Sequence, residues 1–167
     1  DSVVLIDVDD ETRARLRDPF VFWGPHFAEA IARLRAEGAT TVGLDFLAPE
    51  SAEGWFARHD LHHMPETRIL DAGFRGELFQ GDVVLVSSYV VEEGGVVSPQ
   101  LPTTDYLVVL PDLHGLVGIS NIPLDSDSVV RHFRPVPLDA TDRPALSFGL
   151  ALVLHHLGLD PRAERWE

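Results

Sequence analysis

Two apolar runs decide the fold that this sequence predicts: Val3-Val4-Leu5-Ile6-Asp7-Val8-Asp9 and Thr41-Val42-Gly43-Leu44-Asp45-Phe46-Leu47. Each run is nearly continuous in aliphatic and β-branched residues, as expected for a strand that is covered on both faces of its sheet. An amphipathic helix between them makes the segment a parallel strand–helix–strand unit with a right-handed crossover. The carboxyl ends of such strands open onto a shared crevice, where ligands usually bind. We therefore expect Asp7, Asp9 and Asp45 to stand at one rim.

The helix between the two runs has clear boundaries. Gly24 precedes Pro25, and proline suits the first helical position because its missing N–H has no partner there. Gly38 follows as the residue that ends the helix. Apolar residues in between recur at spacings of three and four and form one face: Phe27, Ala30, Ile31 and Leu34.

The rest of the chain completes an α/β pattern. It predicts helices over 51–58, 66–79 and from 142–144 to 157, a variable loop over 92–105, and strands over 83–88, 116–122 and 129–138. The run over 83–88 is continuously apolar, which favours a parallel, central strand, whereas the turn-rich residues 123–128 favour an antiparallel hairpin. The predicted fold is a three-layer α-β-α domain over residues 1–167. Its central mixed sheet has a parallel β-α-β N-terminal half and an antiparallel C-terminal hairpin.

Composition restricts the possible partners and chemistry. The 167 residues include 27 acidic and 13 basic side chains, giving a formal net charge of −14, which disfavours nucleic acid and anionic membrane surfaces as partners. All basic residues are arginine, so mechanisms that need a catalytic lysine are excluded. The absence of cysteine excludes disulfides, thiolate metal sites and cysteine nucleophiles. The chain starts almost directly in an apolar run, so we expect it to be a piece of a larger polypeptide.

Several polar groups are candidates for a binding site. Asp7 and Asp9 could bind a hard cation, although capping of the next helix or turn is the more ordinary role for such residues. Asp127 and Arg131 belong to an Asp-x-Asp turn, in which we expect Arg131 to bond to Asp45 or Asp127. A His-rich stretch contains His59, His62 and His63, but no distant fourth ligand for zinc is evident. No cofactor is indicated.

The order of six short motifs resembles one family. The motifs are Ile6-Asp7 with Thr12, Trp23-Gly24-Pro25 with Ala28, the stretch 38–47, Gly118 to Asn121, Asp125 to Arg131, and Pro144 to Ser147. Over almost its whole length the chain resembles the CHASE type-two domains (cyclases/histidine kinases associated sensory extracellular). One departure is Ser128, at a position where family members commonly have glycine.

This resemblance implies an extracytoplasmic sensory module rather than an enzyme. Such domains belong to bacterial membrane receptors and are followed by a cyclase, histidine kinase or protein kinase in the cytoplasm. The resemblance implies a small-molecule or ion ligand and tethering to the membrane through flanking spans. We expect the ligand near Asp7, Asp9, Asp45 and the 127–131 turn, with Asn121 at the same rim. Two alternatives stay open: a dimerisation or partner-binding module, including a homodimer, and a metal-dependent hydrolase.

Overall fold

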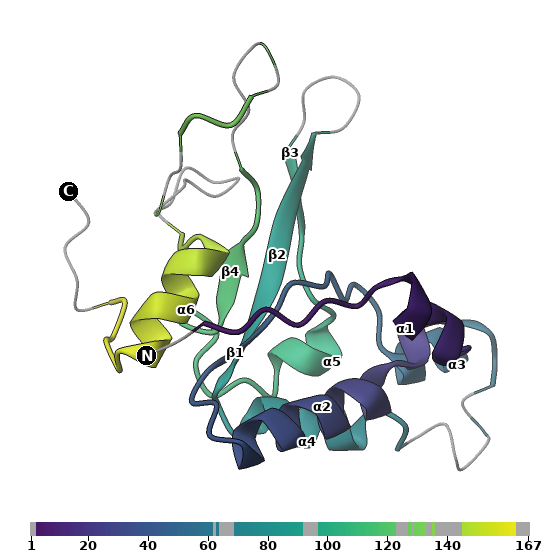
Figure 1. Ribbon diagram of the computed structural model, residues 1–167. Coiled ribbons are helices and arrows are strands. Elements are labelled where there is room, and N and C mark those ends of the chain that lie inside the picture. The colour runs from purple at the N-terminus through teal and green to yellow at the C-terminus, as the bar shows by residue number, and fades with distance from the viewer. Residues whose placement is uncertain are drawn as a thin grey trace.

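The computed structural model describes residues 3–61, 63, 69–91, 97–122, 127, 129–132, 135 and 145–162. Helices and strands alternate around one mixed sheet, as Figure 1 shows, so the α/β class predicted from the sequence is confirmed. None of the helices in these ranges is long and apolar enough to cross a membrane. In chain order the elements are α1 (Asp10–Arg15), η1 (Phe20–Phe22), α2 (Gly24–Ala36), β1 (Val42–Leu44), α3 (Ala52–Arg58), α4 (Ala72–Phe79), β2 (Val83–Val91), β3 (Val97–Gln100), α5 (Thr104–Leu107), β4 (Val117–Ile119) and α6 (Phe148–His156).

Strand β2 is the centre of the sheet. Its first half pairs in parallel with β1, with Val42 opposite Val83, and with β4, with Leu85 opposite Val117. Its second half pairs with β3 in antiparallel fashion, with Ser88 opposite Gln100. The parallel, central position predicted for 83–88 is therefore confirmed.

Two sequence predictions about the sheet are wrong. Residues 3–9 form no strand: they run along the surface to α1 (Figure 1), and among the described residues β1 pairs only with β2. The apolar pattern reports strand-forming propensity, but a strand also needs a backbone partner. The antiparallel pair is made by β3, which falls in the expected loop over 92–105, while residues 129–132 form no strand. Most of the rest of the expected C-terminal strand lies outside the described residues.

Helix α6 covers one face of the sheet at unusually short range. Directly paired residues share a face, so Gly43 with Val84 and Val86 with Gly118 form one row beneath α6. A Cβ atom on Gly118 would lie 2.5 Å from the Cα of Phe148, and one on Gly43 would lie 2.8 Å from the Leu152 side chain. The two glycines thus leave the space that α6 occupies.

Helices α2 and α4 cover the opposite face. Their apolar side chains pack with the alternate residues of β1 and β2 in the main core, which includes Ile31, Phe74, Leu78, Val83 and Leu85. The predicted boundaries of α2 are confirmed, with Pro25 in its first turn and Gly38 at φ 96° after its end. Helix α4 is shorter than predicted within the described residues, because it begins after Asp71.

Candidate functional site

A pocket of about 160 Å³ lies where β1 ends, and we call it the aromatic pocket. After Leu44 the chain turns into a loop that ends at the N-cap of α3, Ser51, whose hydroxyl accepts from the Gly54 amide at 2.9 Å. This loop forms one wall, and η1, α2, α4, β2 and α5 form the others. The lining residues are Phe20, Val21, Gly24, Phe27, Leu44, Phe46, Ala48, Pro49, Glu50, Phe74, Leu85 and Tyr106.

Aromatic rings from distant parts of the sequence pack around this pocket. The ring centroid of Phe27 lies 5.8 Å from that of Phe20, 5.6 Å from that of Phe46 and 5.6 Å from that of Phe74. Phe74 in turn meets Tyr106 edge to face at 4.9 Å. These separations are those of favourable ring pairs, so η1, α2, the β1–α3 loop and α4 are held together by one cluster. Glu50 is the one charged side chain among the lining residues.

A buried carboxylate lies behind the pocket, at a point where three helices begin. The side chain of Asp71 is fully buried, and its Oδ2 accepts from the Ala52 amide at 2.7 Å and from the Tyr106 hydroxyl at 3.0 Å. Ala52 is the first residue of α3, and Asp71 itself precedes α4. The other oxygen, Oδ1, has no hydrogen-bond partner among the described residues and lies against Gly24, the first residue of α2, where a Cβ would overlap it.

Burial and hydrogen bonding have opposite effects on the pKa of Asp71. Burial raises the pKa of Asp71, while the hydrogen bonds from Ala52 and Tyr106 act in the opposite direction. The positive ends of three helix dipoles also favour the ionised form. Burial, followed by the neighbouring Asp71 charge, raises the pKa of Tyr106 well above its usual range, so its hydroxyl stays a donor to Asp71.

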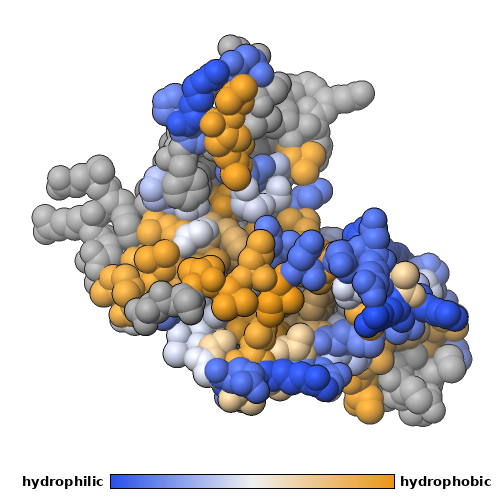
Figure 2. All heavy atoms as spheres, viewed as in Figure 1, coloured by the Kyte–Doolittle hydropathy of each residue, from blue (hydrophilic) through white to orange (hydrophobic). Residues whose placement is uncertain are grey.

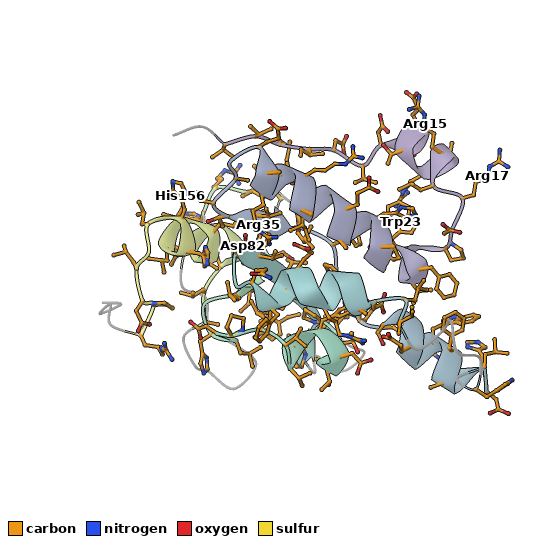
Figure 3. All side chains as sticks on the ribbon, turned by 90° about the horizontal axis from the view of Figure 1, so that it is seen from below. Arg15, Arg17, Trp23, Arg35, Asp82 and His156 are labelled. Atoms are coloured by element: carbon orange, nitrogen blue, oxygen red, sulfur yellow. The ribbon has the colours of Figure 1, made fainter. Side chains whose placement is uncertain are left out.

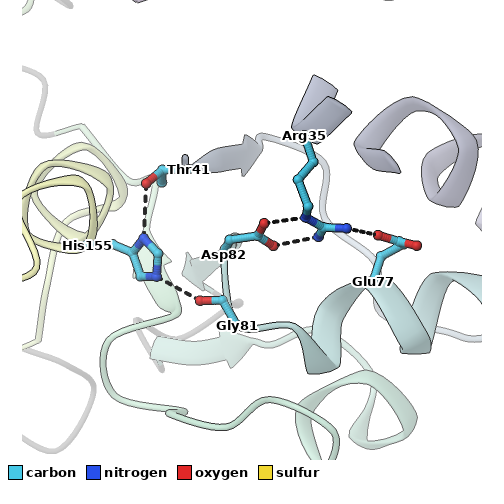
Figure 4. Close-up of polar contacts among 6 residues, drawn as sticks. All are labelled: Arg35, Thr41, Glu77, Gly81, Asp82 and His155. Carbon is cyan, nitrogen blue, oxygen red and sulfur yellow. Dashed lines mark hydrogen bonds and ion pairs between the residues drawn. The ribbon is translucent and has the colours of Figure 1, made fainter. Parts of the chain in front are cut away.

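A second polar cluster holds the opposite end of the sheet. Arg35 donates to Asp82 through Nε at 2.6 Å and through Nη2 at 2.7 Å, and it also pairs with Glu77 (Figure 4). The hydrogen bonds from Arg35 hold the pKa of Asp82 below its usual range. Seen from below, Arg35 and Asp82 point toward each other between α2 and α4 (Figure 3). This cluster ties the end of α2 to α4 and to the start of β2.

Helix α6 is anchored at the same end of the sheet by His155. Its Nε2 lies 2.7 Å from the carbonyl oxygen of Gly81, and its Nδ1 lies 3.0 Å from the hydroxyl oxygen of Thr41 (Figure 4). A ring that donates from Nε2 to the carbonyl can accept the hydroxyl proton at Nδ1, so both bonds fit one tautomer. A larger cavity of about 340 Å³ lies beside it, lined by Gly81, by residues from the segment 111–116 that precedes β4, and by residues from the segment 154–162.

Of the six candidate site residues, the structure brings Asp127 and Arg131 together and places the other four elsewhere. Asp9 caps α1 by accepting from the Thr12 amide at 2.8 Å, which is the structural role that the sequence allowed. Arg131 bonds to Asp127 at 2.8 and 2.7 Å, so one of its two expected partners is confirmed.

The other three candidates do not join them. The side-chain amide of Asn121 bonds to both backbone groups of Tyr89, at 2.5 and 2.9 Å, which continues the pairing between β4 and β2. Asp7 and Asp45 are exposed. Asp45 stands at the pocket end of β1, next to Phe46. The described residues contain no group of three His, Asp or Glu side chains placed to hold a metal ion.

The residues that build this site were not among those predicted from the sequence. Asp71 lies inside the helix predicted over 66–79, whereas in the structure it stands before the first turn of α4. An aspartate just before an apolar helical segment is a known helix-start signal and could have moved that boundary. Nothing in the local pattern indicates that Asp71 also meets α2 and α3.

Comparison with known proteins gives one match. The model of the CHASE2 domain family matches residues 1–165, which is nearly the whole chain. No curated protein and no solved structure matches the chain.

Proposed function

This chain belongs to the CHASE2 domain family, a family of sensory domains of signalling receptors, and we propose that it senses a small apolar ligand held in the aromatic pocket. The observation that carries the proposal is the pocket's position at the carboxyl end of a parallel strand, the usual ligand position in α/β sheets. CHASE2 domains are extracellular sensor domains, and we place this one on the outer side of a bacterial membrane, tethered through flanking segments of a receptor. A sensory role agrees with the expectation that the chain is not an enzyme.

The size and lining of the pocket define the ligand class. A cavity of about 150 Å³ lined by apolar side chains accommodates a benzene-sized molecule, and the aromatic pocket measures about 160 Å³. Phenylalanine rings and aliphatic side chains form most of its wall, which favours one apolar ring and disfavours nucleotides and sugars. Glu50, which pairs with Arg58, offers a carboxylate for a single hydroxyl or amine substituent.

Ligand binding at this position has a route to the rest of the domain. A ligand that touches η1, the start of α2 and the β1–α3 loop at once favours the arrangement in which all three are packed together. Such a bias shifts a conformational equilibrium by the difference in affinity between the two arrangements. We propose that this shift reaches the receptor's cytoplasmic part through the segments that flank the domain. The six candidate residues named from the sequence do not line this pocket and stay predictions for a ligand or ion site.

The proposal is tested by thermal unfolding with benzene, toluene, phenol and indole. Parent protein is expected to show a midpoint that rises with ligand concentration, because the ligand binds the folded state alone. Ala48→Phe places a ring in the pocket and should abolish the rise. Ala32→Phe, on the exposed side of α2, is the matched control and should retain it. A parent midpoint that no ring compound moves, or an unchanged response in Ala48→Phe, would contradict the proposal.

A further inference from the structure

The segment before α1 is an exposed apolar arm, which we define as residues 3–8. Its first four side chains are strongly exposed, at 101% for Val3, 75% for Val4, 92% for Leu5 and 59% for Ile6. No backbone hydrogen bond joins residues 3–8 to any described residue. In Figure 2, apolar atoms gather across the middle of the face that this arm crosses in Figure 1. Contiguous exposed apolar surface in a water-soluble fold marks an interaction site.

The outer edge of β1, on the side away from β2, has backbone groups that could pair with a further strand. The Val42 amide donates to the Asp82 carbonyl at 2.9 Å and therefore faces β2. Successive residues of a strand direct their backbone groups to opposite sides, so the amide and carbonyl of Gly43 face outward. No strand pairs with β1 on that side within the described residues. Gly43 in β1 and Asp45 just after it are both exposed. An unpaired edge of this kind is a template for strand addition.

We propose that the outer edge of β1 is a dimerisation surface and that its occupant is the arm of a second copy of this chain. The arm supplies a β-branched apolar strand without backbone partners, and the edge supplies backbone groups without a strand. Within one chain the two are not paired, although both belong to it.

Exchange of identical arms gives the arm a backbone partner and pairs the outer edge of β1 in both copies. Each copy donates one arm and accepts one, so the assembly is closed by a two-fold axis and leaves no free strand edge at β1. Because the contact is reciprocal, two apolar arms leave water for each dimer formed. The net charge of −14 per chain opposes association, so the dimer should become tighter as salt is raised. This inference is independent of the ligand pocket.

Cysteine pairs test the proposal directly, since the chain has no cysteine of its own. The protein carrying Leu5→Cys is mixed with the protein carrying Asp45→Cys under mild oxidation, and Ile6→Cys replaces Leu5→Cys in a second mixture. Alternation along the arm brings one of the two to the side of Asp45. We expect a disulfide-linked heterodimer in one mixture, well above the amount formed when Val108→Cys replaces the arm variant. Val108 follows α5, and its exposure of 71% lies between those of Ile6 and Leu5. Equal yields would overturn the proposal.

The double variant Leu5→Cys/Asp45→Cys, oxidised at high dilution, separates exchange between chains from pairing within one chain. An intramolecular disulfide under these conditions would overturn the proposal, because the arm would then occupy the edge of its own chain. Sedimentation of the cysteine-free chain gives an independent readout. A dimer that Leu5→Glu weakens by roughly tenfold or more, and that Val108→Glu leaves intact, supports the proposal. A monomer at every concentration overturns it.

Discussion

Two replacements of Asp71, by alanine and by asparagine, separate the stabilisation from its hydrogen bonds from the destabilisation caused by burying its charge. Asp71→Ala leaves the Ala52 amide and the Tyr106 hydroxyl without an acceptor in a fully buried position. Each unsatisfied buried donor costs about 1–3 kcal/mol, so the free energy of unfolding should fall by about 2–6 kcal/mol. That loss is a large part of the roughly 5–15 kcal/mol available to a domain.

Asp71→Asn should behave differently, because its side-chain oxygen can keep both hydrogen bonds. It removes a buried charge whose desolvation costs several kcal/mol, and it adds an amide that faces Gly24, at a cost of about 1–3 kcal/mol. Near neutral pH we expect the asparagine variant to be at least as stable as the parent.

The pH dependence has a definite sign. The folded-state pKa of Asp71 lies above its unfolded value of 3.8. Native protein therefore binds the proton more readily than unfolded protein between these two values. The parent gains stability relative to the asparagine variant as pH falls through this window, and the advantage of the variant shrinks. Urea unfolding followed by tryptophan fluorescence measures all three proteins. An asparagine variant as unstable as the alanine variant near neutral pH would refute the reasoning, because the helix ends would then outweigh burial.

Three further outcomes follow from the packing and the ion pairs. Gly118→Ala should lower the free energy of unfolding by about 1–3 kcal/mol, because the added methyl group clashes with α6. The control Gly76→Ala, in open space on α4, should raise it by about 0.5–1 kcal/mol. Equal effects of the two substitutions in urea unfolding would argue against the close approach of α6. Arg35→Ala should cost more than Arg33→Ala, which breaks an exposed pair worth about 0.5 kcal/mol or less, and thermal unfolding in low and high salt measures both. Because the folded-state pKa of Asp82 lies below 3.8, the ion pair stabilises the folded state fully above that pH, and this stabilisation is lost as pH falls further. In Arg35→Ala, this part of the acid-induced loss of folding stability should be missing. The same dependence of unfolding free energy on pH in the variant and the parent would contradict the prediction.

The parts of the fold that could be predicted from sequence are those fixed by local chemistry. Helix α2 has proline at its start and a glycine in the left-handed conformation after its end, and these positions signal its limits directly. The continuous apolar run in β2 indicates burial on both faces, which is its situation at the centre of the sheet. The capping role of Asp9 likewise depends on a residue only three positions away.

The parts of the fold that could not be predicted depend on tertiary contacts between segments that are distant in sequence. Residues 3–9 have the composition of a strand, but whether they pair is decided by the edge of β1. The burial of Asp71 requires α2 and α3 to converge on the start of α4, across separations that no local pattern encodes. The aromatic pocket has the same origin, since its rings come from positions 20 to 106.

The row of glycines beneath α6 has a mechanical consequence for a sensor. A helix whose backbone almost touches the sheet has no room to slide or rotate, so α6 and the parallel strands should move as one rigid body. The aromatic pocket is walled from the other side, by side chains that can repack. Any displacement that a ligand produces should therefore appear in α2 and η1, as a tilt relative to a stationary α6.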